Sequence, residues 1–184
     1  MDAPVTRPSL ADVTIGVVGS GTDNHDEVAA ELGALLARLG VNLLTGGGQG
    51  VMASVSRAFT QAPRTRGICI GIIPSLDAHR RGRPKPGYPN PFVELAIYTH
   101  LPLSGAQGKS DLSRNHINVL SSAGLVAVPG SDGTLAEISL ALEYGRPVIA
   151  YARDIALLKA FPPEVARTTE LAAIEAFVRN ICYP

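Results

Sequence analysis

Cysteine is scarce in this chain, and it has few aromatic residues and no excess of charge of either sign. Cys69 and Cys182 are too few to build a disulfide framework. Cys69 lies inside an apolar run, where a small buried thiol is the simplest interpretation. No spacing of cysteine and histidine is typical of a metal site, so we expect no bound metal. These absences argue against a disulfide-stabilised scaffold and a zinc module.

The net charge indicates which partners the protein can bind. The chain has 16 lysine and arginine residues and 16 aspartate and glutamate residues, so the charges cancel. A net charge of zero leaves no electrostatic footprint for nucleic acid or an anionic membrane, and we predict neither as a partner. No apolar run approaches the length of a membrane span or of a signal-peptide core, so we expect a cytoplasmic protein. Pro4 and Pro8 favour a flexible tail over residues 1–12, which leaves residues 13–184 as a single domain.

The composition, 46% hydrophobic with 19 glycines, suits an α/β protein with many tight strand-to-helix turns. Short apolar runs predict strands at 13–18, 41–45, 67–74, 92–99, 125–128, 146–150 and 164–168. Helical spacing of apolar residues predicts helices at 26–39, 51–61, 110–123, 135–145, 154–160 and 171–181. We therefore expect a Rossmann-like three-layer α/β fold, with an open, mostly parallel sheet of six or seven strands and helices on both faces.

The turn from Gly130 to Thr134 joins the strand at 125–128 to the next helix. Its glycines allow close approach of the backbone to a ligand, and free N–H groups at the start of a helix favour an anion such as phosphate. The same residues allow a second interpretation, because Thr134 and Glu137 have the S/T-x-x-E spacing of a capping box, in which nothing is bound.

Two further glycine loops follow predicted strands, at residues 19–21 and 46–50. The first is not a dinucleotide fingerprint, because Asn24 stands where G-x-G-x-x-G needs its third glycine. The second has four glycines in five residues, which indicates close backbone approach to a ligand. All three loops leave carboxyl ends of parallel strands, so we expect them to line one crevice. The residues of these loops that we predict to bind phosphate or ligand are Gly19, Ser20, Gly21, Gly46, Gly47, Gly48, Gly50, Val51, Met52, Gly130, Ser131, Asp132, Gly133 and Thr134.

The helix predicted at 110–123, with Ser110 as its N-cap, leads into the strand before the Gly130 turn. Arg114, Asn118 and Ser121 fall on one side of it, opposite an apolar face that includes Leu112, His116 and Leu120. The polar side is either a solvated face or a means of bringing the Arg114 guanidinium to a phosphate at the glycine turn. We interpret His116 as a core histidine rather than a base.

A basic, proline-rich segment covers residues 75–91 and carries Arg80, Arg81, Arg83 and Lys85. Its prolines exclude a regular helix or strand. Such a long connection is either a lid or specificity loop that reaches an anionic ligand, or a solvated mobile loop.

Three stretches resemble a known superfamily: GGGQGVM, GICIGIIP, and R-N-x-x-N followed by PGSDGTLAE. The superfamily is the Rossmann-like group of "possible lysine decarboxylases", whose best-described enzymes are the Lonely Guy (LOG) phosphoribohydrolases. These release base and ribose 5-phosphate from nucleoside 5'-monophosphates and need no cofactor for catalysis. The resemblance implies Arg114 and Glu137 as catalytic residues, with Ser131 at the second glycine of the PGGxGTxxE motif. Lysine decarboxylation is not implied, because nothing in the sequence would bind pyridoxal phosphate.

One branch of this superfamily is more similar than the LOG enzymes themselves. Asn115 follows the arginine where LOG enzymes have lysine, and Asn118 comes three residues later. These asparagines, with RNHINVLSSAGLVAVPG and NPFVELAIYTHL, resemble the molybdenum cofactor carrier proteins. This resemblance implies a protein that binds molybdenum cofactor or a nucleotide, with Asn115 and Asn118 beside Arg114 at the ligand. It also implies a homo-oligomer, either a dimer or a tetramer.

Overall fold

The computed structural model describes residues 13–64, 66–77, 79 and 82–182. Seven strands form its sheet: β1 (Thr14–Val18), β2 (Asn42–Thr45), β3 (Cys69–Ile73), β4 (Leu95–Tyr98), β5 (Gly124–Ala127), β6 (Val148–Tyr151) and β7 (Ala166–Thr168). Five α-helices accompany them: α1 (Asp26–Leu39), α2 (Val51–Gln61), α3 (Asn115–Leu120), α4 (Asp132–Glu143) and α5 (Leu171–Cys182). Two 3₁₀ turns, η2 (Gly105–Gln107) and η3 (Ile155–Leu158), complete the described elements. The predicted tail at residues 1–12 lies outside the described residues.

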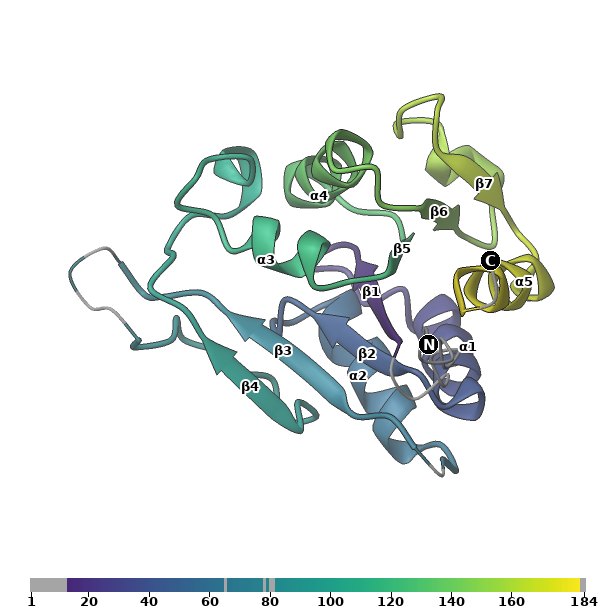
Figure 1. Cartoon of the computed structure of the whole chain (residues 1–184), viewed down its shortest axis with the longest axis horizontal. Helices are drawn as coiled ribbons and strands as arrows, with labels where there is room; N and C mark the ends of the chain where they lie inside the picture. The colour runs from purple at the N-terminus through teal and green to yellow at the C-terminus, as the bar shows by residue number, and fades with distance from the viewer. Residues whose placement is uncertain (1–12, 65, 78, 80–81, 183–184) are drawn as a thin grey trace, which may run out of the picture.

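The sheet is parallel throughout, in the order β4-β3-β2-β1-β5-β6-β7 (Figure 1). The chain starts in the middle at β1, moves outward to β4, and returns to place β5 on the other side of β1. This confirms the predicted Rossmann-like α/β fold. It also creates a switch in strand order between β1 and β5, where the loops leaving neighbouring strands turn to opposite faces of the sheet.

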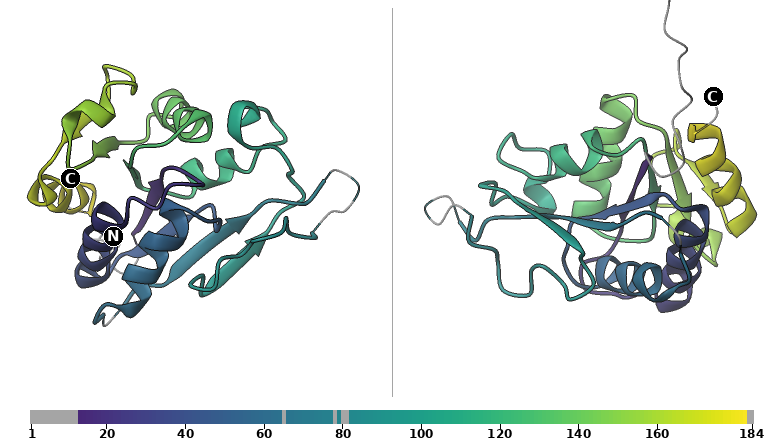
Figure 2. Two further views of the ribbon diagram at one scale, coloured as in Figure 1. Left: turned by 180° about the vertical axis from the view of Figure 1, so that it is seen from behind. Right: turned by 60° about the horizontal axis from the view of Figure 1, so that its bottom comes forward.

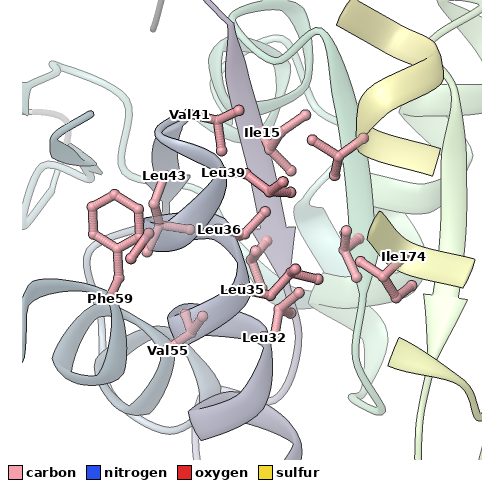
Figure 3. Close-up of a cluster of buried hydrophobic side chains, with 14 of the residues drawn as sticks. Ile15, Leu32, Leu35, Leu36, Leu39, Val41, Leu43, Val55, Phe59 and Ile174 are labelled. Carbon is pink, nitrogen blue, oxygen red and sulfur yellow. The ribbon is translucent and has the colours of Figure 1, made fainter. Parts of the chain in front are cut away.

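Helices cover both faces of the sheet. Helices α1 and α2 lie together on one side, and α3 and α4 lie on the other (Figure 2, right). The larger core fills the space under α1, α2 and α5, where Leu32, Leu36 and Phe59 are fully buried against the sheet residue Leu43 (Figure 3). A second core lies under α3 and α4. Burial of these apolar faces holds the strands in register and therefore holds the loops at their carboxyl ends.

Helix α1 covers the residues 26–39 that its apolar spacing predicts. It ends at Gly40, whose φ of 72° is the left-handed conformation that glycine adopts without steric cost, and whose N–H bonds to the Ala37 carbonyl at 3.1 Å. The regular elements are thus predicted well where apolar periodicity is strong.

Helix α3 differs from its prediction, because it spans only six residues and Ser110 is not its N-cap. Arg114 occupies the N-cap position instead, and the hydroxyl of Ser113 just before it accepts the Asn115 N–H at 3.2 Å. The predicted faces are also wrong in part: Leu112 and Leu120 are 49% and 48% exposed, whereas Arg114 and Asn118 are buried. The polar side of this segment faces the interior because the first turns of α4 supply its partners.

Candidate functional site

Three glycine loops meet at the switch point, and backbone hydrogen bonds join them. The Ser20 N–H, after β1, donates to the Pro129 carbonyl after β5 at 3.1 Å. The Ser20 carbonyl accepts the N–H of Val51, the first residue of α2, at 2.9 Å. Ser20 therefore links all three loops, which confirms that they converge on one crevice.

Glycine at position 50 makes this junction possible. Its φ is 64°, and a Cβ there would overlap the Ser20 carbonyl oxygen. The buried Ser20 hydroxyl accepts the N–H groups of Thr22 and Asp23 at 3.2 and 2.9 Å, so it shapes its own turn. Gly50 and Ser20 therefore hold the loops in shape, and this structural role explains their residue types without any ligand.

A pocket of about 220 Å³ opens between the loops. It is lined by residues from β1 and its loop, the second glycine loop, the basic segment, the η2 turn, α3 and α4, namely Val17, Val18, Gly19, Gly21, Thr22, Gly46, Met52, Tyr88, Ser104, Gly105, Arg114, Asn115, Ser131, Gly133, Thr134 and Glu137. The tertiary structure thus brings together segments more than 100 residues apart in the sequence.

Several predicted ligand-binding residues lie beside this pocket without lining it: Ser20, Gly47, Gly48, Gly50, Val51, Asn118, Gly130 and Asp132. Their positions have local reasons. A Cβ at Gly48 would meet the Tyr88 ring at 2.7 Å, and the Val51 side chain packs against Gly19. A side chain at Gly130 would overlap the Thr134 hydroxyl. These glycines let the loops pack closely, and the pocket is what their packing leaves open.

The start of α4 faces the pocket. The N–H groups of the first turn of a helix have no acceptor within the helix. In α4 the N-cap residue Ser131 does not supply one, because its side chain makes no capping bond. The capping-box interpretation of Thr134 and Glu137 is wrong, because the helix begins three residues earlier than predicted. The Thr134 hydroxyl is buried and has no hydrogen-bond partner among the described residues. Unpaired donors at a helix N-terminus favour an anion in the pocket.

Arg114 brings a positive charge to the same pocket. Its side chain is only 5% exposed, and its guanidinium lies against Gly46, where any larger residue would displace it. Its Nε and Nη1 groups have no hydrogen-bond partner among the described residues. A buried guanidinium with unused donors is costly to leave unpaired, so this geometry is suited to a phosphate or carboxylate.

Glu137 lies one turn into α4 and is buried beside Arg114. Its Oε1 accepts a hydrogen bond from the Asn118 side-chain amide (Nδ2) at 2.7 Å, while the side-chain oxygen Oδ1 of Asn118 has no partner among the described residues. Burial raises the pKa of Glu137, and the Arg114 charge and the Asn118 hydrogen bond oppose that shift. The pocket therefore holds an acid whose ionisation depends on what lies next to it.

The stability of Glu137→Gln relative to the wild type is expected to increase as the pH rises above the ordinary carboxyl range. Because the folded-state pKa lies above the ordinary value of 4.5, the folded protein binds a proton more tightly than the unfolded chain. This tighter proton binding stabilises the folded wild type at low pH. The stabilisation is lost as the pH rises from the ordinary carboxyl pKa of 4.5 through the raised pKa of Glu137. Urea unfolding of both proteins from about pH 4.5 to 7.5 measures the difference, which is expected to grow with pH.

The matched control is Glu143→Gln, which removes an exposed carboxylate from the other end of the same helix. Its stability relative to the wild type is expected to stay nearly constant over this pH range. A pH-independent difference for Glu137→Gln would contradict the raised pKa.

Two other sequence interpretations have clear outcomes. His116 is hydrogen-bonded, with Nδ1 at 2.6 Å from the Tyr144 hydroxyl and Nε2 at 3.0 Å from the Ser110 carbonyl oxygen. It is half-buried rather than in the core and does not line the pocket. Cys69 is buried as predicted, and burial raises the pKa of its thiol to about 11. Neither residue takes part in the site.

Sequence reasoning missed Tyr88, Ser104 and Gly105 as pocket residues. Tyr88 belongs to the basic segment at residues 75–91. The basic composition of that segment was the one sequence feature that could have indicated a role at the pocket. Ser104 and Gly105 lie in a connection between β4 and α3 with no recognisable motif, so only the fold could identify them.

Within the described part of the chain, no group of three or more histidine, cysteine, aspartate or glutamate side chains is arranged to hold a metal ion. In the same residues, every helix is too short or too polar to cross a membrane. The chemistry of the site thus rests on Arg114, Glu137, the asparagines beside them and the backbone N–H groups of α4.

Comparison with known proteins identifies the family and supports the fold. Residues 12–177 match the model of the SLOG cluster4 family. The structure superimposes on the molybdenum cofactor binding protein of Rippkaea orientalis with a TM-score of 0.70 and 32% identity, covering 92% of this chain and 96% of that one. It superimposes equally on the molybdenum cofactor carrier protein of Chlamydomonas reinhardtii, with a TM-score of 0.70, 29% identity and coverage of 94% and 99%. An uncharacterised protein of Archaeoglobus fulgidus is 31% identical over 136 residues, 73% of this chain and 76% of that protein.

Proposed function

This chain belongs to the SLOG cluster4 family, and on that premise we propose that it binds a phosphorylated, nucleotide-like small molecule as a carrier-like protein for molybdenum cofactor or a related ligand. The observation that carries the proposal is the buried Arg114 guanidinium, whose Nε and Nη1 have no partner among the described residues, at the same pocket as the start of α4, which no side chain of its N-cap Ser131 caps. Both groups bind a phosphate well, and both border one pocket.

The rest of the pocket suits the remainder of such a ligand. Met52 and Val18 contribute apolar surface, and Tyr88 contributes an aromatic ring. A planar heterocycle packs favourably against side chains of this kind. The pterin of molybdenum cofactor and the base of a nucleotide are both planar and both carry a phosphate through a short linker. The similarity to two molybdenum cofactor proteins supports the pterin.

A second function is favoured by one specific observation, namely that Arg114 and Glu137 both line the pocket. In a phosphoribohydrolase, water adds across the N-glycosidic bond of a nucleoside 5'-monophosphate, giving free base and ribose 5-phosphate. An ionised Glu137 would stabilise positive charge on the ribose as the bond breaks, and Arg114 would hold the phosphorylated substrate. We rank the carrier function first because the chain is similar to two molybdenum cofactor proteins and because Asn115 and Asn118 accompany Arg114.

One experiment separates the two functions. Purified protein is incubated with a panel of nucleoside 5'-monophosphates, and free base and ribose 5-phosphate are followed by chromatography, with Glu137→Gln as the control. We expect no release of base, together with thermal stabilisation of the protein by a phosphorylated pterin. Release that disappears in Glu137→Gln would instead establish the phosphoribohydrolase. If no base is released and no phosphorylated compound stabilises the protein, both functions are contradicted.

The homo-oligomeric state and the cytoplasmic location implied above stay predictions. Exposed apolar side chains lie on the edge strand β4, where Leu95, Ile97 and Tyr98 are 45%, 43% and 53% exposed, and such a surface would suit self-association.

A further inference from the structure

The basic segment after β3 leads from the carboxyl edge of the sheet, the edge that carries the pocket (Figure 1). Of its four basic residues, Arg80 and Arg81 lie outside the described residues and Arg83 is exposed. Lys85 is different, because it is half-buried and its ammonium donates to the Pro102 carbonyl at 2.7 Å. The segment is therefore not a freely solvated loop at this point.

Hydrogen bonds fasten this part of the segment to the second glycine loop. The Gln49 side chain donates to the Gly87 carbonyl at 2.8 Å. The backbone N–H of Asn90 donates to the Gly47 carbonyl at 2.8 Å, and its side-chain amide donates to the Gly48 carbonyl at 2.9 Å. Between these attachments Tyr88 lines the pocket. Lys85 does not itself line the pocket, but it lies three residues before Tyr88 on the segment that these bonds attach to the second glycine loop.

Two residues, Ser104 and Gly105, stand between the Lys85 ammonium and the start of α4. The ammonium is 3.5 Å from the Ser104 hydroxyl oxygen, and Ser104 and Gly105 both line the pocket. Gly105 is in turn the nearest neighbour of Gly133, since a Cβ added to Gly133 would meet it at 3.6 Å. Ser104 and Gly105 therefore connect Lys85 to the helix N-terminus that favours an anion.

The positive charges of Lys85 and Arg114 are not balanced by neighbouring ionised acids among the described residues. Burial lowers the pKa of Lys85, and the positive charge of Arg114 lowers it further. Lys85 makes no ion pair among the described residues, and an ammonium group has three donors, of which one has a short contact here. Glu137 is the acid that faces Arg114, and its protonated form is favoured by burial. Two neighbouring cations with unused donors are stabilised by an anion that both contact.

We propose that Lys85 is a phosphate-binding residue of this site, which contacts the phosphate monoester of the ligand together with Arg114 and the N-terminus of α4. The inference rests on the proposed function and adds a residue that neither the glycine motifs nor the similarity to known proteins assigns. It gives the basic segment a role in recognising the charged end of the ligand. A phosphate monoester, which carries up to two negative charges, matches this pair of cations.

The test compares Lys85→Gln with Arg83→Gln, a control that removes the same charge from an exposed position two residues away. The probes for isothermal titration calorimetry are inorganic phosphate, nucleoside 5'-monophosphates with their parent nucleosides, and a phosphorylated pterin with its unphosphorylated parent. We expect Lys85→Gln to weaken binding of the phosphorylated probes about tenfold or more, because a charge-assisted hydrogen bond is lost. Binding of the unphosphorylated parents is expected to be unchanged, and Arg83→Gln is expected to stay within about twofold of the wild type.

Two further results complete the design. Lys85→Arg keeps the positive charge and is expected to recover most of the lost affinity, while thermal unfolding reports whether each variant is folded. A wild type that binds phosphorylated probes and a Lys85→Gln variant that binds them equally well would overturn this inference alone. Equal loss for phosphorylated and unphosphorylated probes would also overturn it. A wild type that binds no phosphorylated probe would overturn both this inference and the proposed function.

Discussion

Replacement of Gly133 by valine is expected to abolish binding of the phosphorylated ligand while the protein stays folded. Gly133 is the second residue of α4 and lines the pocket. A Cβ at this position meets only Gly105, at 3.6 and 3.8 Å, which is ordinary van der Waals contact. The backbone therefore tolerates the change, but the valine methyl groups fill the space that the phosphate needs against the helix N-terminus.

The expected loss of affinity is more than about 100-fold, or roughly 2.7 kcal/mol, by titration calorimetry. Gly133→Ala provides a graded comparison, because alanine adds less volume and raises helix propensity by about 1 kcal/mol relative to glycine. Affinity is expected to fall from glycine to alanine to valine, and the melting temperature is expected to stay level or rise. A valine variant that binds as tightly as the wild type would exclude this turn as the phosphate site.

The second large effect is expected from Arg114→Ala, which should weaken binding of the phosphorylated ligand by about 1.5–3 kcal/mol, or roughly 10- to 150-fold. The guanidinium is buried, and its Nε and Nη1 donors have no partner among the described residues. Arg114→Lys is expected to fall between the wild type and alanine, because it keeps the charge but loses the planar, forked donor geometry.

Arg57→Ala is the matched control for the arginine variants. Arg57 lies on the surface of α2, where its side chain is 48% exposed and pairs with Asp26 at 3.1 Å. Its loss is expected to leave affinity within about twofold of the wild type, since exposed ion pairs contribute about 1 kcal/mol or less and this one is remote from the pocket. If Arg57→Ala and Arg114→Ala weaken binding equally, the effect of Arg114 is one of global electrostatics and not of direct contact.

The carrier and hydrolase functions use the same phosphate site, so both variants affect either function. What separates the functions is Glu137, whose carboxylate is buried, bound to Asn118 and held next to Arg114. A carrier needs this group only as a neighbour of the arginine, whereas a hydrolase needs it ionised at the reacting carbon. The pH dependence of stability in Glu137→Gln therefore informs the choice even before a substrate is identified.

Most of the fold was predictable because its elements have strong local signals. The apolar spacing from Val28 to Leu39 predicts α1 with the correct bounds, and Gly40 ends the helix as expected. Residues 110–123 were predicted less well, because a short amphipathic helix has two candidate faces and the sequence does not say which one meets another element. Leu112 and Leu120 are exposed, whereas Arg114 and Asn118 are buried because the adjacent α4 presents the Glu137 carboxyl to the polar face.

The sequence by itself determined the alternation of strands and helices and the three glycine loops, and hence that a phosphate-binding crevice should form at the carboxyl edge of a parallel sheet. These features depend on local periodicity and on residue types that permit tight turns. Only the tertiary structure decided that Arg114 is buried, that Thr134 does not cap α4, that Tyr88 lines the pocket, and that Lys85 lies next to the pocket residue Ser104. The physical reason is that such contacts join segments far apart in the chain, through irregular loops whose side-chain directions follow no period.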